Sequence, residues 1–230
     1  MIRRTTSKEL AHERLGAEFG GALSTYDTTR RIDVLIDGFL AGQVAGRQAL
    51  DVGSGLGFFS ERLAARGAKV TACDIGPGLV AQTRARAGCD SIVADALRLT
   101  DTFGRDRFDL VVSSECIEHV PSPDEAIGQM MAVLKPGGLL SLSTPNILWQ
   151  PVVRLASTLR LRPFDGHENF SSWSSIRCAI LANGGSIIAE RGLHLFPFQL
   201  PFHRLSTWCD QRLQVMRPFM INICVLARKA

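Results

Sequence analysis

The positions of apolar residues divide the chain into a helical lead-in and a region where strands and helices alternate. Within residues 1–46, apolar side chains recur every three or four positions, as on one helical face; they are Ile32, Leu35, Ile36, Phe39 and Leu40. From Arg47 on, short apolar runs rich in strand-favouring residues alternate with helical stretches; they are ALDVG, AKVTACDI, SIVADA, FDLVVSSE and GLLSLSTP. This alternation is typical of βαβ units and predicts an α/β fold with a mostly parallel, doubly wound sheet.

Capping signals mark one helix clearly. Ser122, Pro123 and Glu125 supply an N-cap, a first-turn proline and a capping-box partner, which predicts a helix over 122–134. The turn KPGG, residues 135–138, is expected to end this helix before the strand GLLSLSTPN.

The chain after this strand is predicted to contain an insertion, a helix and two strands. Residues 147–170 fit neither period and are the expected insertion. A helix is expected over about 172–183, closed by Asn183 and Gly184. The strands SIIAERG and INICVLARK follow. Because no repeat, low-complexity tract or linker interrupts the sequence, residues 1–230 are predicted to form one domain.

The composition is that of a folded protein with no marked preference for nucleic acid. Of the 230 residues, 46% are hydrophobic, which is ample for a large core. The net charge is +4, but Lys and Arg are scattered, so no nucleic-acid partner is expected. The six cysteines lack CxxC spacing, which predicts reduced, largely buried thiols and no zinc site. The sequence has no uncharged apolar run of about 18 residues, so a cytoplasmic protein is expected.

The sequence DVGSGLG, between a predicted strand and a predicted helix, is the main candidate for a ligand-binding loop. Gly53, Gly55 and Gly57 allow a sharp turn and a close approach of backbone to ligand. The dinucleotide fingerprint GxGxxG would need a further glycine where Phe58 stands. Asp51 would repel a pyrophosphate and suits a ligand with a cationic amino-acid end, as in S-adenosylmethionine (SAM). The alternative is that the glycines only form a tight turn.

Two further acids follow the next two predicted strands. Asp74 ends AKVTACD, where a carboxylate can accept hydrogen bonds from both ribose hydroxyls. Asp95 ends SIVAD, where a carboxylate can meet the adenine amine while Ala96 and Leu97 contact the ring. Either acid alone would more often be a helix cap or a loop residue. Because successive parallel strands end at one crevice, Asp51, Asp74 and Asp95 are predicted to converge on one ligand.

Taken in order, the motifs DVGSGLG, TACDIG, VADAL, FDLVVSSECIEHV and LKPGGLLSLSTPN resemble those of the class I SAM-dependent methyltransferases. The chain is most similar to the O-methyltransferases of ubiquinone biosynthesis, which methylate catechol-type polyprenyl hydroxyls. The resemblance covers about residues 28–229 and is strongest up to Asn146. It implies a Rossmann-like seven-stranded sheet with N-terminal helices, in which the last strand is antiparallel to the sixth.

The resemblance also implies a set of SAM contacts. The expected contacts beyond the acids and glycines already named are Ser54 of the loop, Ile75 after the second strand, Ala96 and Ser114. A family arginine ahead of the first strand matches Arg31 or Arg30, and the spacing leaves that choice open.

The single domain is expected to have four parts. Residues 1–46 form the lead-in, 47–146 the SAM-binding core, 147–220 an acceptor-side insertion and helix, and 221–229 the last strand. The tail, defined as residues 193–220, follows no pattern of the family. Because acceptor specificity is usually built in such segments, the sequence leaves the acceptor open.

Glu115, Glu118 and His119 follow the fourth strand at spacings that would place them on one helical face. Two carboxylates and an imidazole could hold Mg²⁺, which would lower the pKa of an acceptor hydroxyl, and the similar family has a metal at this triplet. One alternative is that Glu118 and His119 only shape the SAM pocket and the substrate mouth. Another is that His119 serves as a general base. His167 is a further candidate ligand or substrate contact, and the alternative is a solvated loop histidine. No cysteine stands in a nucleophile motif, as expected for an in-line methyl transfer.

The stretch 148–164 combines apolar and aromatic residues with arginines and has no acid. It suits an interfacial helix that touches anionic lipid, so a peripheral membrane contact is one expectation. The other is a lid helix over the acceptor, with solvated arginines. Later aromatic residues are expected either to line an apolar acceptor pocket or to pack over the sheet edge; they are Phe196, Phe198, Phe202 and Trp208.

The sequence therefore predicts a SAM-dependent methyltransferase that O-methylates a hydroxylated small molecule such as a catechol or quinone precursor. A methyltransferase acting on a sugar or lipid-linked glycan is the enzyme alternative. A SAM-binding protein without turnover is the alternative of another class, and intact motifs argue against it. A nicotinamide oxidoreductase is disfavoured by Phe58.

Overall fold

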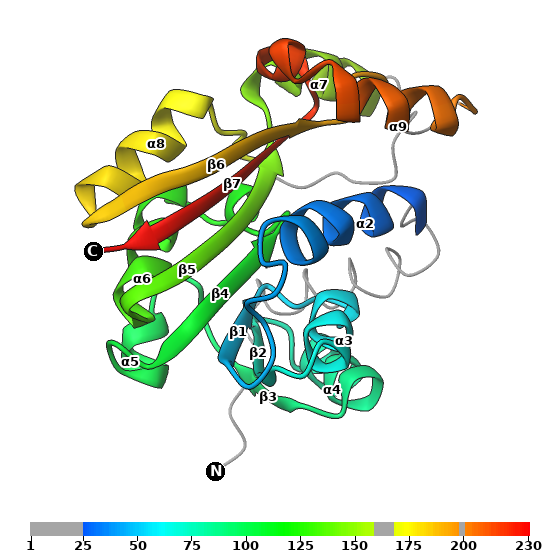
Figure 1. The fold of residues 1–230 in the computed structure, drawn as a ribbon. Helices are drawn as coiled ribbons and strands as arrows, with labels where there is room; N and C mark the ends of the chain where they lie inside the picture. The colour runs from blue at the N-terminus through cyan, green and yellow to red at the C-terminus, as the bar shows by residue number, and fades with distance from the viewer. Residues whose placement is uncertain (1–24, 159–167, 198–200) are drawn as a thin grey trace.

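The computed structural model describes residues 25–158, 168–197 and 201–230. In this part of the chain, seven strands form one sheet in the order β3-β2-β1-β4-β5-β7-β6 (Figure 1). β1 to β5 are parallel, and β7 runs antiparallel between β5 and β6. The strands are β1 Gln48–Val52, β2 Lys69–Asp74, β3 Asp90–Val93, β4 Phe108–Ser114, β5 Leu134–Pro145, β6 Gly185–Leu193 and β7 Asn222–Lys229.

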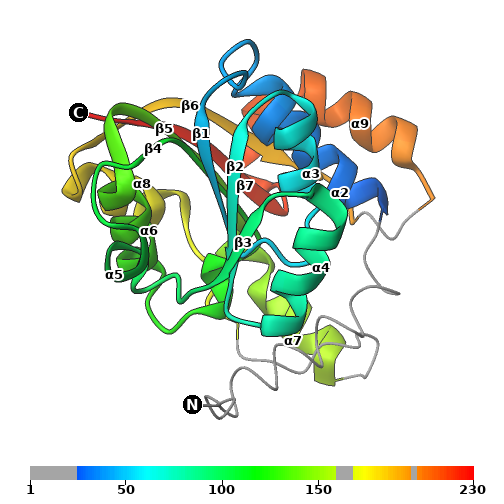
Figure 2. The same ribbon diagram turned by 90° about the horizontal axis from the view of Figure 1, so that it is seen from below.

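Helices cover both faces of the sheet, which gives a three-layer architecture. Figure 2 shows α5, α6 and α8 on one face and α2, α3 and α4 on the other. The helices are α2 Thr25–Ile32, α3 Phe58–Ala65, α4 Pro77–Ala87, α5 Leu99–Phe103, α6 Pro123–Val133, α7 Gln150–Thr158, α8 Trp173–Ala182 and α9 His203–Arg212. The shorter turns are the π-helical η1 Asp33–Gly38 and the 3-10 helices η2 Ile117–His119, η3 Ile147–Trp149 and η4 Gln214–Phe219.

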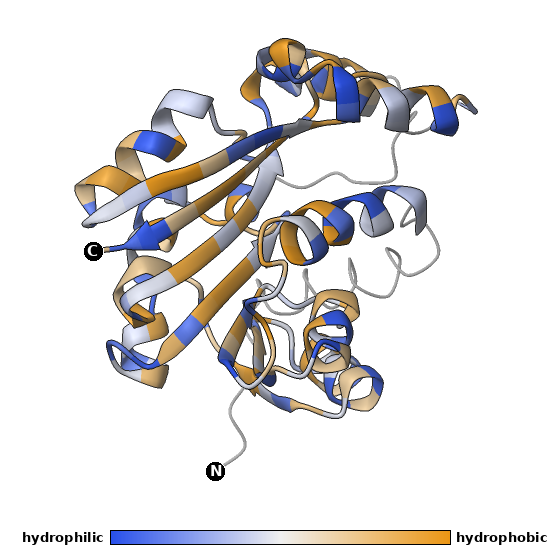
Figure 3. Ribbon diagram, in the orientation of Figure 1, coloured by the Kyte–Doolittle hydropathy of each residue, from blue (hydrophilic) through white to orange (hydrophobic). Residues whose placement is uncertain are grey.

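Two clusters of buried apolar side chains fill the spaces between sheet and helices. One cluster packs α5, α6 and α8 against the sheet and includes Phe108, Met130 and Ile180. The other packs η1 and α3 against the opposite face and includes Leu35 and Leu63. The central strands are buried on both faces. In Figure 3, orange apolar segments in β4 and β5 alternate with pale segments of intermediate hydropathy.

The structure confirms the predicted α/β class and the predicted helix before β5, but not its capping. The helix is α6, which begins at Pro123. Ser122 makes no side-chain capping hydrogen bond, so the predicted capping box is wrong there; the first turn begins at the conformationally restricted Pro123. A capping box exists instead at α8, where the Ser172 hydroxyl accepts a hydrogen bond from the Ser175 amide.

The predicted KPGG turn lies inside β5. Phe108 pairs with Leu134, and Leu110 pairs with Leu139, so three extra residues of β5 bulge out of the ladder. Gly137, with φ 75°, permits this irregularity. The predicted turn is therefore a bulge within the strand.

The lead-in and insertion are partly described. The lead-in contains α2 and η1; residues 1–24 lie outside the described part. The insertion begins with η3 and α7, and residues 159–167, including His167, also lie outside it. All six cysteines are free thiols, as predicted, although Cys178 is exposed. No helix in the described ranges is long and apolar enough to cross a membrane.

Candidate cofactor site

The strand order reverses between β1 and β4, and this reversal places the candidate site. The chain builds β2 and β3 on one side of β1 and then returns to β4 on the other side. Ligands of doubly wound sheets bind beyond the carboxyl ends of the strands at such a point. Val52 and Ser113 are paired in register, and the Ser113 hydroxyl donates to the Val52 carbonyl at 3.0 Å. The loop that begins at Gly53 and the end of β4 at Ser114 are therefore neighbours.

The loop between β1 and α3 needs its glycines for two different reasons. Gly53, Gly55 and Gly57 have φ of 71°, 52° and 83°, a region that disfavours residues with a Cβ. A Cβ on Gly53 would lie 2.4 Å from Cys116 Sγ, and one on Gly57 would lie 2.9 Å from Thr83 Cα. A Cβ on Gly55 would meet nothing within 4 Å. Gly53 and Gly57 thus allow close packing, whereas Gly55 borders open space, as a ligand cradle requires.

Asp74, at the end of β2, joins its strand to the glycine loop. Its carboxylate accepts hydrogen bonds from the backbone amides of Gly55, at 2.9 Å, and Gly76, at 3.0 Å. A carboxylate can accept about four hydrogen bonds, so Asp74 retains acceptor capacity for a ligand. Ile75, the next residue, is half-buried.

Asp51 lies beneath the loop rather than at its surface. The side chain is buried and accepts a hydrogen bond from Ser60 Oγ at 2.5 Å. Burial, with help from the negative charge of Asp74, raises the pKa of Asp51 to about 7 despite the Ser60 hydrogen bond. Ser54 Oγ similarly turns inward and hydrogen-bonds Thr83 Oγ1 at 3.1 Å.

Asp95 lies two residues beyond β3, which ends at Val93, instead of at the strand end. Its carboxylate accepts a hydrogen bond from the Leu97 amide at 2.9 Å, a contact typical of a local turn. Asp95 and Ala96 are both half-buried. They border the same edge of the sheet as Asp74, because the Ala94 amide donates to the Asp74 carbonyl at 3.0 Å.

Arg30 and Arg31, the two candidates for the family arginine that contacts the cofactor, have different partners. Arg31 donates hydrogen bonds to the Asp27 carboxylate through Nε and Nη2. Its Nη1 donates to Ser114 Oγ at 2.7 Å. Arg30 instead pairs with Asp210 at 3.5 Å. Of the two arginines, Arg31 is therefore the one beside Ser114 and the crevice.

Glu115, Glu118 and His119 do not share one helical face. Glu115 has φ 53°, and only the short 3-10 helix η2 follows, so the chain forms no α-helix there. Ser143 Oγ and Asn222 Nδ2 each donate to Glu115 at 3.0 Å. Thr144 Oγ1 donates to Glu118 at 3.2 Å, and His119 Nε2 lies 4.0 Å from Glu118 Oε1.

The predicted Mg²⁺ site is not supported by this arrangement. In the described part of the chain, no three His, Cys, Asp or Glu side chains are grouped so that they could hold a metal ion. The reason is local: both oxygens of Glu115 already accept hydrogen bonds, and Glu118 faces Thr144. Burial raises the pKa of both glutamates well above the usual range, with Glu118 adding to the effect at Glu115.

The structure adds polar residues that the sequence analysis did not identify. His194 of the tail lies 2.9 Å from Asp27 of α2, and Asn222 of β7 binds Glu115. The sequence offers a signal for one contact of these residues, the ion pair between Asp27 and Arg31. An acid and a base four positions apart on a helix can pair with each other. Nothing local marks His194 or Asn222, since their partners are far along the chain.

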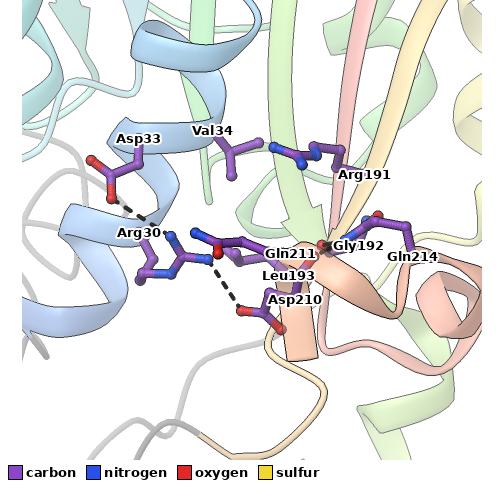
Figure 4. Close-up of a pocket in the computed structure, with 9 residues that line it drawn as sticks. All are labelled: Arg30, Asp33, Val34, Arg191, Gly192, Leu193, Asp210, Gln211 and Gln214. Carbon is purple, nitrogen blue, oxygen red and sulfur yellow. Dashed lines mark hydrogen bonds and ion pairs between the residues drawn. The ribbon is translucent and has the colours of Figure 1, made fainter. Parts of the chain in front are cut away.

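A separate cavity of about 180 Å³ lies between α2, β6 and α9 (Figure 4). Its lining includes Arg30, Arg191, Asp210 and Gln214 but neither the glycine loop nor the three acids. In Figure 4, Arg30 extends between Asp33 and Asp210. This cavity is therefore distinct from the predicted cofactor site.

The aromatic residues of the tail are more exposed than the sequence suggested. Phe202 and Trp208 are 58% and 53% exposed, and Phe196 is 38% exposed. Packing over the sheet edge and lining of an acceptor pocket therefore both stay predictions for these residues. Phe198 lies outside the described residues.

Sequence comparison identifies the family of the central region. Residues 50–142 match the family described as a methyltransferase domain. The chain is 31% identical over 163 residues to the ubiquinone biosynthesis O-methyltransferase of Bradyrhizobium sp. (strain ORS 278), covering 67% of this chain and 64% of that protein. It is 32% identical over 146 residues to the biotin biosynthesis bifunctional protein BioHC of Cellvibrio japonicus (strain Ueda107), covering 61% and 29%. The chain thus spans less than two thirds of the length of these curated relatives.

Solved structures show the same fold at low sequence identity. An S-adenosylmethionine dependent methyltransferase from Mesorhizobium loti has a TM-score of 0.64 at 20% identity, covering 81% of this chain and 93% of that chain. The magnesium protoporphyrin IX methyltransferase of Synechocystis PCC 6803, solved with bound SAH, has a TM-score of 0.64 at 19% identity, covering 89% and 84%. The chain has the class I methyltransferase fold, as predicted. Its residues 50–142 are a methyltransferase domain.

Proposed function

We propose that this protein transfers a methyl group from SAM to a hydroxyl group of a small molecule such as a catechol or quinone precursor. The observation that carries the proposal is the placement of the glycine loop, Asp74 and Ser114 at the carboxyl ends of β1, β2 and β4, where the strand order reverses. The methyltransferase domain over 50–142 supports the cofactor. The names of relatives in ubiquinone biosynthesis support a hydroxyl acceptor.

The residues of the crevice fit SAM. Asp74 has acceptor capacity left for the ribose hydroxyls. Asp95 and Ala96 border the place expected for the adenine of SAM. The Asp51 carboxylate lies beneath the glycine loop, where its negative charge would favour the cationic amino-acid end of SAM. Gly55 leaves room for close approach, because a Cβ there would meet no atom within 4 Å. When bound, SAM supplies an electrophilic methyl group.

The acceptor hydroxyl must lose its proton as it gains the methyl group. His119 is the proposed general base, since it follows β4 at the same edge and its side chain is 24% exposed. The protein otherwise has to hold the acceptor oxygen in line with the methyl group and sulfur, which requires no covalent catalysis. Mg²⁺ is not needed in this scheme.

An apolar or amphiphilic acceptor is favoured by exposed side chains on η3 and α7. Leu148, Val152 and Leu155 are 55%, 53% and 60% exposed and recur at helical spacing. Figure 1 shows α7 beyond the carboxyl ends of the strands. We include in the proposal that this face contacts anionic lipid, with Arg154 as the described basic residue.

Vesicle flotation at low and high salt tests the lipid contact. Anionic vesicles should carry the native protein at low salt, and the pair Val152→Ser and Leu155→Ser should stay at the bottom of the gradient. Equal flotation with neutral vesicles would contradict the charge component. If the native protein does not float with vesicles in any condition, the proposed lipid contact is refuted.

An acceptor screen with methyl-labelled SAM tests the function. Labelled product is expected with catechols or quinol precursors. Label only in sugars or lipid-linked glycans would replace the acceptor class with the glycan alternative. Tight SAM binding with no label in any acceptor would favour a SAM-binding protein without turnover.

A further inference from the structure

A continuous buried network connects the tail to the cofactor crevice. His194 Nε2 lies 2.9 Å from Asp27 Oδ1, while Asp27 Oδ2 accepts from Arg31 Nη2 at 2.7 Å and Nε at 3.1 Å. Arg31 Nη1 then donates to Ser114 Oγ at 2.7 Å. His194, Asp27 and Arg31 are 0%, 7% and 5% exposed. A tail residue is thus linked to Ser114 through two ionic side chains.

The ionisation of Asp27 fixes the direction of its contact with His194. Burial would raise the pKa of Asp27, but Arg31 and His194 outweigh burial and lower it to about 2. An ionised carboxylate can only accept hydrogen bonds, so the imidazole Nε2 is the donor. His194 therefore holds the carboxylate oxygen that Arg31 leaves unused.

The backbone at His194 is itself unusual. Its φ is 61°, a region that costs free energy for a residue with a side chain and persists where surrounding contacts impose it. The His194 carbonyl accepts from the Ile221 amide at 3.0 Å, next to the pairing of Leu193 with Asn222 at the ends of β6 and β7. The end of the sheet thus fixes where the imidazole lies.

We propose that His194 is a positioning residue for Arg31, an inference that rests on the proposed SAM-binding function. The imidazole fixes the plane of the Asp27 carboxylate, which holds two of the guanidinium N–H groups. The remaining Nη1 is thereby directed at Ser114, at the rim of the crevice. Supporting groups of this kind lock the side chains that contact a ligand in one orientation.

Contacts that only dock the tail on α2 provide a control. Tyr26 Oη donates to the His203 carbonyl at 3.0 Å and hydrogen-bonds Thr207 Oγ1 at 2.9 Å. These bonds attach α9 to the helix that carries Arg31 but do not touch Asp27. Tyr26→Phe removes them and should leave SAM affinity unchanged.

The matched pair His194→Gln and His194→Asn tests the proposal by calorimetric titration with SAM. Gln places an amide donor near the position of Nε2 and should bind SAM within about twofold of the native protein. Asn tolerates positive φ but is too short to reach Asp27, so it should lose about tenfold. Equal affinity of the Asn variant and the native protein would overturn the proposal. Melting temperatures of both variants show whether either one fails to fold. If the Asn variant does not fold, His194→Gln and Tyr26→Phe decide the question. Loss of SAM affinity in either of these folded proteins would contradict the positioning role.

A double-mutant cycle with Arg31→Gln separates positioning from a general effect on the fold. If His194 acts through Arg31, His194→Asn should change SAM affinity less than twofold once Arg31 is replaced. A tenfold loss in both backgrounds would overturn the proposal. If the native protein binds no SAM, the proposed function on which the inference rests is refuted. If the native protein binds SAM and the His194 variants bind it equally well, only the positioning role is refuted.

Discussion

Asp74 at the end of β2 accepts a hydrogen bond from the Gly55 amide, in the middle of the loop that follows β1. Two segments that the sequence analysis treated as separate ligand contacts are therefore one structure, in which the acid shapes the loop. Asp74 also binds the Gly76 amide, so its carboxylate has a fixed orientation at the sheet edge. Substitution of Asp74 should consequently affect both the loop and the ligand.

Asp74→Ala should weaken SAM binding by about 2 kcal/mol or more, or about thirtyfold, because a buried hydrogen-bonded carboxylate is lost. Calorimetric titration measures this change. Asp101→Ala is the control, since Asp101 forms an exposed ion pair with Arg98 on the surface. Unchanged affinity of the Asp74 variant would mean that the site is misplaced.

Gly55 and Gly88 form a matched pair for separating ligand binding from backbone strain. Both have positive φ, 52° and 62°, and a Cβ on either would meet nothing within 4 Å. Alanine at each position should therefore destabilise the protein by a similar amount, about 1 kcal/mol. Only Gly55→Ala should also weaken SAM binding. Equal SAM affinity of the two variants would argue against a ligand at the loop.

SAM affinity should rise with pH through the ionisation of Asp51. Burial raises the pKa of this carboxyl from 3.8 to about 7, so the ionised form dominates only above neutrality. Since the cationic amino-acid end of SAM favours the ionised form, the Kd should fall by up to about tenfold between about pH 6 and 8. Asp51→Asn should flatten this dependence, and a native Kd independent of pH would contradict the assignment.

The same shift predicts an opposite trend in stability. Folded protein holds the Asp51 proton more tightly than the unfolded chain, whose pKa is near 3.8. The contribution of Asp51 to the free energy of unfolding should therefore fall as the pH rises from about 4 to 7. Urea titrations of native protein and Asp51→Asn across this range would reveal the difference.

Chelation distinguishes the two roles considered for the acidic motif after β4. Because the oxygens of Glu115 are bound by Ser143 and Asn222, turnover should be unchanged by EDTA. His119→Ala should lower the rate about a hundredfold if the imidazole takes the acceptor proton. Activity abolished by EDTA and restored by Mg²⁺ would instead establish the metal. Full activity both in EDTA and in the variant would leave positioning alone as the source of catalysis.

Asp27 should contribute to stability at neutral pH and lose that contribution in acid. Its folded pKa is about 2, against 3.8 for an unperturbed carboxyl, so the contribution is present above about pH 4 and disappears as the pH falls toward 2. The difference corresponds to about 2 kcal/mol. Acid unfolding of Asp27→Asn should therefore depend less on pH in this range than that of the native protein, and equal dependence would contradict the network.

The half of the fold that carries the candidate cofactor site was predictable because its signals are local. The glycine loop, the apolar runs and the acids after each strand occur within short segments, and the strand order follows from the rules of doubly wound sheets. The acidic motif was misjudged because helical spacing was assumed, whereas the left-handed backbone of Glu115 redirects its side chain. A single residue with positive φ gives little signal in sequence periodicity.

The contacts of the tail could not be predicted for a different reason. His194 reaches Asp27 across 167 positions, and Asn222 reaches Glu115 across 107. Such pairs arise only after β6 and β7 are placed beside β5. Periodicity describes which face of an element is buried, but it does not specify which distant polar groups meet there.

Calorimetric titration of the native protein with SAM, with its demethylated product SAH and with NAD is the most direct test of the central claim. The crevice at the β1 and β4 reversal should bind SAM and SAH at one site per chain and should not bind NAD, because Asp51 lies beneath the loop and Phe58 stands where the dinucleotide fingerprint needs glycine. Binding of NAD without SAM, or no binding of either SAM or SAH, would contradict the account.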